Sequence, residues 1–318
     1  MADWQPTATL ETLRRRAELM AAIRHFFSFR GIWEVDVPVL AKTGVTDLNI
    51  DSIPAELNGR RHYLQSSPEY QMKRLLAAGS GGIYYLGKAF RDDESGRRHS
   101  PEFTLLEWYR PGWDEHDLID EVSSLLRELG IVTEPVKMSY REIFQQSIGL
   151  DPHTASLEVL QQEAKVLSGS DFTAVSRNSC LDLLFSLGVE PTLPDGLVFV
   201  YDYPLCQAAL ACRGEDFSGV PVARRFEAFL NRMELANGYY ELTDAVEQCS
   251  RFESDLALRA AAGKPAMPVD HQLLAAMKSG LPACAGVALG VDRLLMQLLS
   301  LSDICEVLPF GIRCDVND

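Results

Sequence analysis

Residues 90–109 read FRDDESGRRHSPEFTLLEWY, a charged connection that runs into an apolar segment. Ile83–Phe90 and Phe103–Arg110 are rich in aromatic and β-branched residues, which predicts two strands of a hairpin. Loops as long as the connection between them are usually functional or disordered. An arginine at the base, a basic tip and Phe103 on the return strand could hold the phosphates and base of a nucleotide. An exposed loop held by ion pairs is the alternative.

Apolar periodicity predicts helices along much of the remaining chain. The expected helices are Leu10–Phe29, Glu69–Ala78, Glu115–Leu129, Tyr140–Ser147, Ser156–Leu167, Ser176–Leu187, Leu242–Ala262 and Val291–Leu299. The further expected strands are Trp33–Val39, His62–Gln65, Leu197–Tyr201, Ala223–Leu230 and Cys284–Leu289. Strands flanked by grouped helices indicate an α+β fold around a mainly antiparallel sheet. Because the chain shows no internal repeat or interdomain linker, we expect one domain over residues 1–318.

The charge balance argues against general nucleic-acid binding. The chain carries 30 Lys and Arg against 45 Asp and Glu, a formal net charge of −15. It therefore lacks the overall basic footprint of a nucleic-acid-binding protein, although a local basic patch is compatible with this balance. Three short basic runs are candidates, Arg14–Arg16, Arg60–Arg61 and Arg97–His99. Such runs are more often a solvated surface than a binding site.

The cysteines and the N-terminal residues favour a cytosolic protein without membrane contact. The seven cysteines show no CxxC pair and no Cys/His spacing typical of zinc sites. They are Cys180, Cys206, Cys212, Cys249, Cys284, Cys305 and Cys314. The first residues lack the apolar segment of a signal peptide, and no apolar run approaches the roughly 20 residues of a membrane span. We therefore expect reduced thiols that pack as small apolar groups.

A second motif, GVALGVDRL at residues 286–294, joins a small-residue strand to a helix. Gly286 and Gly290 allow another group to approach the backbone closely, and Arg293 falls in the first turn of the helix. The spacing is not that of a dinucleotide-binding fingerprint. A tightly packed turn with an ion-paired arginine is the alternative interpretation.

A third segment, residues 225–248, places three carboxylates in an apolar, strand-like stretch. Glu227, Glu234 and Glu241 flank Asn237-Gly238, a dipeptide that favours a hairpin turn. Carboxylates are costly to bury unless they meet cations or a metal ion. Glutamates on an exposed strand face remain the alternative.

Together these segments resemble the class II aminoacyl-tRNA synthetases. Residues 90–109 are similar to motif 2 of that family and residues 286–294 to motif 3. The helix that ends at Arg30-Gly31 and the strand through Pro38 resemble motif 1, which forms the dimer interface in the family. LQSSPEYQMKRLL (64–76) and ELANGYYELTDAVEQCSRF (234–252) match the lysine subgroup. The resemblance covers nearly the whole chain in the expected order, and it implies a class II catalytic core and a homodimer.

The lysine subgroup contains a truncated branch. Lysyl-tRNA synthetases carry an N-terminal OB-fold that reads the anticodon, whereas motif 1 begins here almost at the first residue. The chain thus resembles the truncated lysyl-tRNA synthetase paralogues, which have no anticodon-binding domain. That family joins (R)-β-lysine, through an adenylate, to the ε-amine of a lysine on elongation factor P. The resemblance implies ATP and Mg²⁺ as requirements, elongation factor P as partner and no stable tRNA binding.

The resemblance also implies an ATP site. Arg91 and Arg293 are its catalytic residues, since Arg91 is expected to contact the α-phosphate and the amino-acid carboxylate, and Arg293 to cover the adenine. Phe103 is expected to stack on the adenine, and His99 to lie near the γ-phosphate. The remaining ATP-binding positions are Asp92, Asp93, Ser100, Glu234, Leu235 and Gly290. Asp92-Asp93 replaces the usual Asn-Glu of the family, and Ser100 replaces a usual Asn.

The amino-acid site follows from the same resemblance. Ser67, Pro68 and Glu69 are expected to meet the amine near the carboxylate end, and Asn237 to lie near the carboxylate. Glu241 and Tyr109 are expected to bind the distal ammonium, because a buried ammonium needs a carboxylate partner and further acceptors.

Two more assignments concern specificity and metal. Ala288 stands where lysyl-tRNA synthetases usually have glycine, and its methyl group is expected to reshape the pocket at the end where α-lysine and β-lysine differ. Glu227 and Glu234 match the carboxylates that hold Mg²⁺ on ATP in the family.

Two other functions share these features. A minimal synthetase paralogue could pass the activated amino acid to tRNA or to a small-molecule amine. A catalytically inactive binding module usually loses the motif arginines, whereas Arg91, Arg293 and Glu234 are present here. ATP–pyrophosphate exchange followed by transfer assays separates these alternatives.

Overall fold

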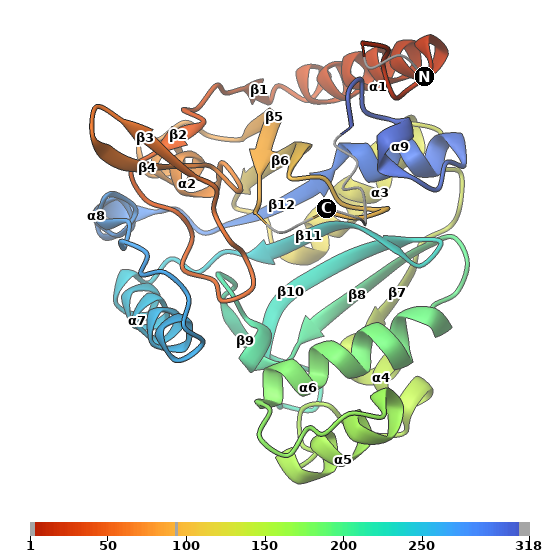
Figure 1. The fold of residues 1–318 in the computed structure, drawn as a ribbon, viewed down its shortest axis with the longest axis vertical. Coiled ribbons are helices and arrows are strands. Elements are labelled where there is room, and N and C mark those ends of the chain that lie inside the picture. The colour runs from red at the N-terminus through yellow and green to blue at the C-terminus, as the bar shows by residue number, and fades with distance from the viewer. Residues whose placement is uncertain (1–3, 93–94, 312–318) are drawn as a thin grey trace. The chain divides into compact units, whose positions relative to one another are not determined.

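The computed structural model describes residues 4–92 and 95–311 (Figure 1). Its helices are α1 (Leu10–Phe29), α2 (Glu69–Ala77), α3 (Glu115–Glu128), α4 (Tyr140–Ile148), α5 (Leu157–Ser168), α6 (Arg177–Leu184), α7 (Ala245–Ala261), α8 (His271–Gly280) and α9 (Val291–Leu299). Its strands are β1 (Trp33–Glu34), β2 (Leu40–Ala41), β3 (Pro54–Leu57), β4 (Arg60–Leu64), β5 (Ile83–Phe90), β6 (Glu102–Pro111), β7 (Val136–Ser139), β8 (Leu197–Tyr203), β9 (Arg213–Glu215), β10 (Pro221–Leu230), β11 (Met233–Tyr240) and β12 (Cys284–Gly290). Within the described ranges, no helix is both long and apolar enough to cross a membrane.

Residue contacts divide the chain into two compact units. Unit 1 contains the described residues of 1–113, 124–131 and 243–318, and unit 2 contains residues 114–123 and 132–242. The single domain expected over residues 1–318 stays a prediction.

Unit 1 contains the predicted hairpin and the motif that pairs with it. Its strand order is β1-β5-β6-β12, in which β5, β6 and β12 are antiparallel neighbours and β1 runs parallel to β5 (Figure 1). β5 and β6 pair continuously from Ile83↔Tyr109 to Phe90↔Glu102. β12 then pairs with β6 from Cys284↔Pro111 to Gly290↔Leu105. The segments that resemble motifs 2 and 3 are thus neighbouring strands of one sheet.

The first helix agrees with the prediction, whereas the strand after it is shorter. α1 covers Leu10–Phe29 as expected, and its buried residues include Ile23 and Phe27. The Phe27 ring stacks on Tyr84, with 4.5 Å between centroids. Only Trp33–Glu34 of the expected strand Trp33–Val39 forms a ladder. Pro38 has no amide hydrogen to donate, which helps to explain why the ladder does not extend.

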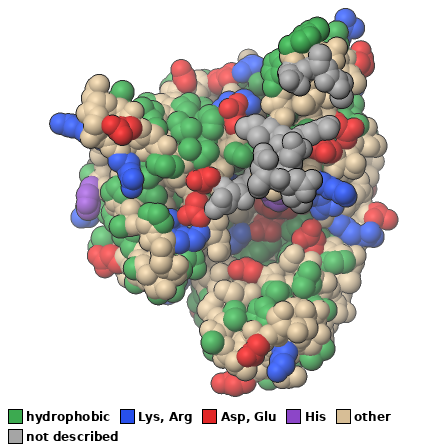
Figure 2. Space-filling view, viewed as in Figure 1, with side chains coloured by type: hydrophobic (Ala, Val, Ile, Leu, Met, Phe, Trp, Pro, Cys, Tyr) green, Lys and Arg blue, Asp and Glu red, His purple; other side chains and the backbone are tan. Residues whose placement is uncertain are grey.

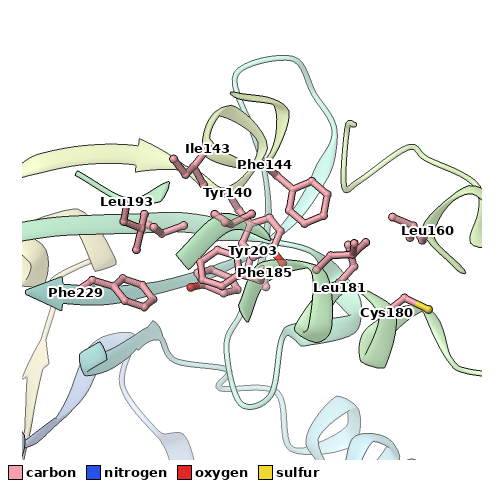
Figure 3. Close-up of a cluster of buried hydrophobic side chains, with 14 of the residues drawn as sticks. Tyr140, Ile143, Phe144, Leu160, Cys180, Leu181, Phe185, Leu193, Tyr203 and Phe229 are labelled. Atoms are coloured by element: carbon pink, nitrogen blue, oxygen red, sulfur yellow. The ribbon is translucent and has the colours of Figure 1, made fainter. Parts of the chain in front are cut away.

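Unit 2 contains five paired strands and a hydrophobic core of its own. The strand order is β11-β10-β8-β7, with β9 paired to the edge of β10, and only β7 and β8 are parallel. Rings from separate elements meet in the core, where Tyr140 lies 5.1 Å from Phe185 and 4.8 Å from Tyr203 between centroids (Figure 3). Antiparallel pairs therefore predominate in both units, and the predicted α+β class is confirmed.

The turn before β11 corrects the sequence prediction. The hairpin turn is at Asn231-Arg232, where both residues have positive φ (49° and 65°), and not at Asn237-Gly238. Asn237 and Gly238 lie inside β11, opposite Glu227 and Phe226. Two consecutive residues with positive φ form the tight turn that matches strand twist. The Asn-Gly signal was misleading because the strand continues through it.

Other boundaries differ for local reasons. The helix expected from Leu242 begins at Ala245, because the Asp244 side chain accepts hydrogen bonds from the amides of Val246 and Glu247 and caps the helix. The helix expected over Ser176–Leu187 ends at Leu184 and continues as one π-helical turn. The sequence prediction missed α8 and the strands β2, β3, β7 and β9.

Candidate active site

The strand register of unit 1 collects several predicted residues on one face of the sheet. Residues directly opposite one another in a ladder point to the same face. Glu107 lies opposite Ala288, and Tyr109 lies opposite Gly286. Leu105, two residues before Glu107, is opposite Gly290. Because Gly286, Ala288 and Gly290 have small side chains or none, they leave room on the face to which Glu107 and Tyr109 point.

Glu107 is the centre of this face, although the sequence analysis did not select it. Its side chain is buried, with 2% exposure. One carboxylate oxygen accepts a 2.7 Å hydrogen bond from the Ser67 hydroxyl, and the other accepts a 2.7 Å bond from the Tyr109 hydroxyl. Both donors belong to the predicted amino-acid site. A buried carboxylate that holds two of its members in place is a positioning residue for that site.

The loop that begins α2 is held by the same hydroxyl group. The Ser67 hydroxyl accepts a 3.0 Å hydrogen bond from the Glu69 amide, and Pro68 is the N-cap of α2. The Glu69 carboxylate forms a 2.6 Å ion pair with Lys73, which is 1% exposed. The predicted residues Ser67, Pro68 and Glu69 are therefore linked to Glu107 and Tyr109 through hydrogen bonds.

The predicted nucleotide groups of the hairpin lie at its open end. The Arg91 guanidinium lies over the Phe103 ring, 5.1 Å from its centroid. The Arg91 amide also donates a 3.0 Å hydrogen bond to the Pro101 carbonyl, which closes the base of the connection. A cation beside an aromatic face is the pair of groups that we expected for phosphate and base.

Arg293 joins the tip of this connection to α9. Its guanidinium hydrogen-bonds the His99 ring nitrogen Nε2 at 2.5 Å and donates to the Arg98 carbonyl at 3.2 Å. Asp292 beside it is buried and accepts a 2.7 Å bond from the Thr104 amide, while it forms a 2.6 Å ion pair with Arg16 of α1. The start of α9 is thus bonded to Thr104, the residue that follows Phe103. This bond holds the motif 3 helix in a fixed position against the motif 2 strand β6.

Of the other predicted residues in the connection between β5 and β6, the structure describes Asp92 and Ser100. The Asp92 amide donates a 2.8 Å hydrogen bond to the Asp51 carbonyl, and Ser100 is buried. Asp93 lies outside the described residues. The predicted roles of Asp92, Asp93 and Ser100 in binding ATP stay predictions.

Unit 2 contains the second predicted group, on neighbouring strands. Glu227 of β10 lies opposite Asn237 of β11, and Arg225 contacts both: it forms a 2.5 Å ion pair with Glu227 and donates a 3.2 Å bond to the Asn237 side-chain oxygen. The Asn237 amide donates in turn to the Tyr239 hydroxyl at 3.1 Å. Arg225 was missed because its charge reads from the sequence as an ordinary strand-end cation.

The electrostatics of Glu227 indicate a site that favours a further cation. Burial raises the pKa of this carboxyl group to about 7, and the negative charge of Glu234 adds to the effect while Arg225 opposes it. Glu234 and Leu235 follow on β11, and Glu241 directly after the strand is buried, with its backbone bridged to Ala211. Two carboxylates that disfavour each other's charge fit a divalent cation.

The structure therefore brings the predicted residues together as two groups. Unit 1 holds Ser67, Pro68, Glu69, Arg91, Asp92, His99, Ser100, Phe103, Tyr109, Ala288, Gly290 and Arg293. Unit 2 holds Glu227, Glu234, Leu235, Asn237 and Glu241. A lone carboxylate in the apolar run FTLLEWY was the signal by which Glu107 could have been found.

A family model for the tRNA synthetases of class II (D, K and N) matches residues 1–313. Because this match spans almost the whole chain, the chain belongs to that family, and it is an ATP-dependent ligase of the class II synthetase type.

Within this family, the chain is similar along its whole length to proteins of one name. The chain is 45% identical over 321 residues to the elongation factor P–(R)-β-lysine ligase of Photorhabdus laumondii, with 98% of both chains covered. It is 46% identical to the protein of the same name from Vibrio vulnificus, with 97% of this chain and 98% of that one covered. The protein of that name from Avibacterium paragallinarum is 46% identical over 320 residues. The predicted resemblance to the lysine-type class II enzymes is confirmed.

Proposed function

We propose that this chain activates (R)-β-lysine with ATP and transfers it to the ε-amine of a lysine on elongation factor P. The observation that carries the proposal is similarity at 45–46% identity along 97–98% of the chain to ligases named for this reaction. Two sets of contacts support the same conclusion: Ser67 and Tyr109, both assigned to the amino acid, share Glu107 as a hydrogen-bond partner, and Asn237 and Glu227 share Arg225.

The first step forms the adenylate. A carboxylate oxygen of β-lysine attacks the α-phosphorus of ATP, a new O–P bond forms, and pyrophosphate leaves with the electron pair of the broken P–O bond. Arg91 stabilises the charge that develops on the α-phosphate, and Phe103 and Arg293 hold the adenine. Because phosphoryl and nucleotidyl transfer depend mainly on positioning and electrostatics, no side chain has to act as a general base.

Mg²⁺ fits the carboxylates of unit 2. Glu227 and Glu234 are the residues that would hold it, and it would supply positive charge against the phosphates of ATP. Burial raises the pKa of Glu227 to about 7, so its acid and carboxylate forms coexist near neutral pH, and a bound cation would favour the ionised form. Arg225 already stabilises the ionised form of Glu227 in part, because the two side chains form an ion pair.

The amino acid is held at both ends. Tyr109 and Glu241 bind the distal ammonium, while Ser67, Pro68 and Glu69 meet the amine near the carboxylate and Asn237 the carboxylate itself. Glu107 keeps the hydroxyl groups of Ser67 and Tyr109 in place through its two 2.7 Å hydrogen bonds. The small side chain of Ala288 opposite Glu107 sets the space available beside them.

The second step is acyl transfer to the acceptor protein. The neutral ε-amine of the acceptor lysine attacks the adenylate carbonyl carbon, an amide bond forms as the nitrogen releases a proton to solvent, and AMP leaves with the electrons of the broken C–O bond. We propose that the enzyme acts as a homodimer through α1 and the strand after it, in the cytosol and without stable tRNA binding. The net charge of −15 supports the last point, since phosphate contacts dominate nucleic-acid affinity.

The test has two assays on one preparation. With Mg²⁺ and ATP, the protein is expected to catalyse pyrophosphate exchange that depends on (R)-β-lysine, and then to add one β-lysyl group to elongation factor P, as measured by intact mass. Arg293→Ala is expected to lose most of the exchange activity, whereas Lys165→Ala, which removes an exposed cation on α5, keeps it. Exchange without modification of elongation factor P, or anticodon-dependent charging of tRNA, would contradict the proposed acceptor.

A further inference from the structure

A cluster of cations on the β3–β4 hairpin has no part in the reaction steps above. We name Lys42, Arg60, Arg61 and His62 the basic hairpin. Together with Leu57 and Asn58 they line an open hollow of about 580 Å³. Lys42, Arg60 and Arg61 are exposed, and His62 is half-buried.

The fold of unit 1 creates this cluster from separate segments. β2, β4 and β3 form a small antiparallel sheet in that order. A two-residue turn, Asn58-Gly59 with φ of 52° and 69°, places Arg60 directly after the turn and opposite Leu57. On the other side, Ala41 of β2 pairs with Tyr63, which brings Lys42 to the same sheet. Tyr63 is buried, so the sheet is anchored at its base while its charged end faces solvent.

The positive charges of the basic hairpin are not neutralised by the parts of the chain that the structure describes. No carboxylate of residues 4–92 or 95–311 forms an ion pair with Lys42, Arg60 or Arg61. Glu56 lies opposite Arg61 in the register, yet these two charged groups make no ion pair either. By contrast, Arg24 pairs with Glu34 at 2.9 Å and Arg30 with Glu128 at 3.0 Å elsewhere in unit 1.

This arrangement is unexpected for so acidic a chain. Acidic residues exceed basic ones by 15, yet Lys42, Arg60 and Arg61 lie together without an ion pair to any carboxylate in the described ranges, although like charges repel one another. Figure 2, in the view of Figure 1, shows basic side chains around an acidic one at the left margin, where Figure 1 places the β3–β4 hairpin. A positive cluster on a negatively charged protein can steer an acidic partner to that part of the surface.

We propose that the basic hairpin is the docking surface for the acceptor protein and that it binds a carboxylate-rich face of elongation factor P. This inference rests on the proposed function, in which the acceptor is the one macromolecular substrate. An acidic protein is repelled by most of an enzyme of charge −15, so complementary contact is confined to local clusters of unpaired cations.

Two features favour a protein over a nucleic acid as the occupant. Three unpaired cations are few for stable phosphate-backbone binding, which typically involves about 6–10 phosphate contacts. The hollow is also lined by Leu57, an exposed apolar side chain that lies opposite Arg60 in the hairpin. A mixed apolar and cationic lining is typical of the contact surface of a protein partner.

The experiment compares two charge-reversal pairs of equal net change. Arg60→Glu/Arg61→Glu reverses the basic hairpin, and Lys165→Glu/Lys278→Glu reverses two exposed lysines on α5 and α8 as the matched control. Each protein is assayed for (R)-β-lysine-dependent pyrophosphate exchange and for modification of elongation factor P over a range of NaCl concentrations. Exchange is expected to be unchanged in both variants, since neither pair belongs to the adenylation site.

The hairpin variant is expected to lose about 10- to 100-fold in kcat/KM for elongation factor P at low salt, mainly through KM, because steering by clustered charge changes association rates by 10–10³-fold. The difference from wild type is expected to shrink as salt screens the charges. The control pair is expected to change kcat/KM much less at every salt concentration.

Several results would overturn the proposal, and each is distinct. Equal effects of the two variants would show that net charge and not the hairpin matters. A hairpin variant that becomes monomeric by light scattering would assign the surface to a second copy of this chain. Loss of binding to duplex RNA with unchanged modification of elongation factor P would assign it to nucleic acid. If the wild type modifies no elongation factor P, the proposed function itself fails, and exchange activity shows whether the adenylation step survives.

Discussion

Neutralising Asp292 tests how the two motif segments of unit 1 are held together. Asp292 is 2% exposed, forms a 2.6 Å ion pair with Arg16 and accepts a hydrogen bond from the Thr104 amide. Asp292→Asn keeps an oxygen that can accept from Thr104 but removes the charge that compensates Arg16. Arg16 itself is 8% exposed, so its guanidinium remains buried without a counter-charge.

The expected magnitude follows from burial. Breaking a buried ion pair from one side costs about 3–5 kcal/mol, because the remaining charge stays desolvated. The exposed pair Arg15–Glu18 has a similar N–O distance of 2.8 Å, with side-chain exposures of 56% and 63%. Glu18→Gln is therefore the matched control, for which about 0–1 kcal/mol is expected.

Urea unfolding followed by circular dichroism, at one protein concentration, measures both losses. Asp292→Asn is also expected to raise KM for ATP, because Asp292, the residue before Arg293, accepts a hydrogen bond from the amide of Thr104, the residue after Phe103. Adding Arg16→Met to Asp292→Asn is expected to recover part of the lost stability, since no buried charge is then left unpaired. The reasoning is wrong if Asp292→Asn costs no more than Glu18→Gln, or if the double variant is less stable than Asp292→Asn alone.

Three further substitutions test the site. Glu107→Gln is expected to weaken use of (R)-β-lysine by roughly 10- to 100-fold while KM for ATP is unchanged, because hydrogen bonds to a charged group contribute about 1.5–3 kcal/mol; equal losses for both substrates would contradict this. Ala288→Gly is expected to shift pyrophosphate exchange towards α-lysine by up to about 200-fold, the upper range for one methylene in a pocket, and an unchanged α/β ratio would remove Ala288 from the specificity argument. The pKa of Glu227 is raised from its usual 4.5 to about 7, so the folded state binds more protons than the unfolded state between these values, and stability is expected to fall as pH rises from 4.5 to 7 and then level off. Glu227→Gln should flatten that decline in urea titrations at several pH values; a decline that persists unchanged would assign it to other groups.

Sequence patterns were most informative where the decisive interactions are local. The limits of α1 and α9 agree with periodicity, because a stripe of apolar residues at helical spacing can be buried in only one way. The β5–β6 hairpin was also predictable, since two aromatic-rich runs flank a single polar connection. The family motifs were recognisable for the same reason: each is a continuous stretch of chain.

The site residues that sequence reasoning missed depend on partners distant in the chain. Glu107 gains its role from Ser67, 40 residues earlier, and Asp292 from Arg16 on the first helix. Neither partner can be inferred from residues nearby in sequence. The same holds for the basic hairpin, where Lys42 joins Arg60 and Arg61 only because β2 pairs with β4.

The turn at Asn231-Arg232 shows most clearly how tertiary contacts can override a local sequence preference. Locally, Asn237-Gly238 is the better turn sequence, and a positive φ at an arginine costs about 1–2 kcal/mol. Tertiary contacts offset that cost: the Asn231 side chain accepts a 3.0 Å hydrogen bond from the Gly196 amide, and Arg232 donates to the Leu193 carbonyl at 2.9 Å and pairs with Asp195 at 3.0 Å. The sequence by itself determined the α+β class and the family, and it predicted which residues form the site. Only the tertiary structure decided where β10 turns into β11, and therefore that Glu227 lies opposite Asn237, because strand register depends on contacts made across the fold.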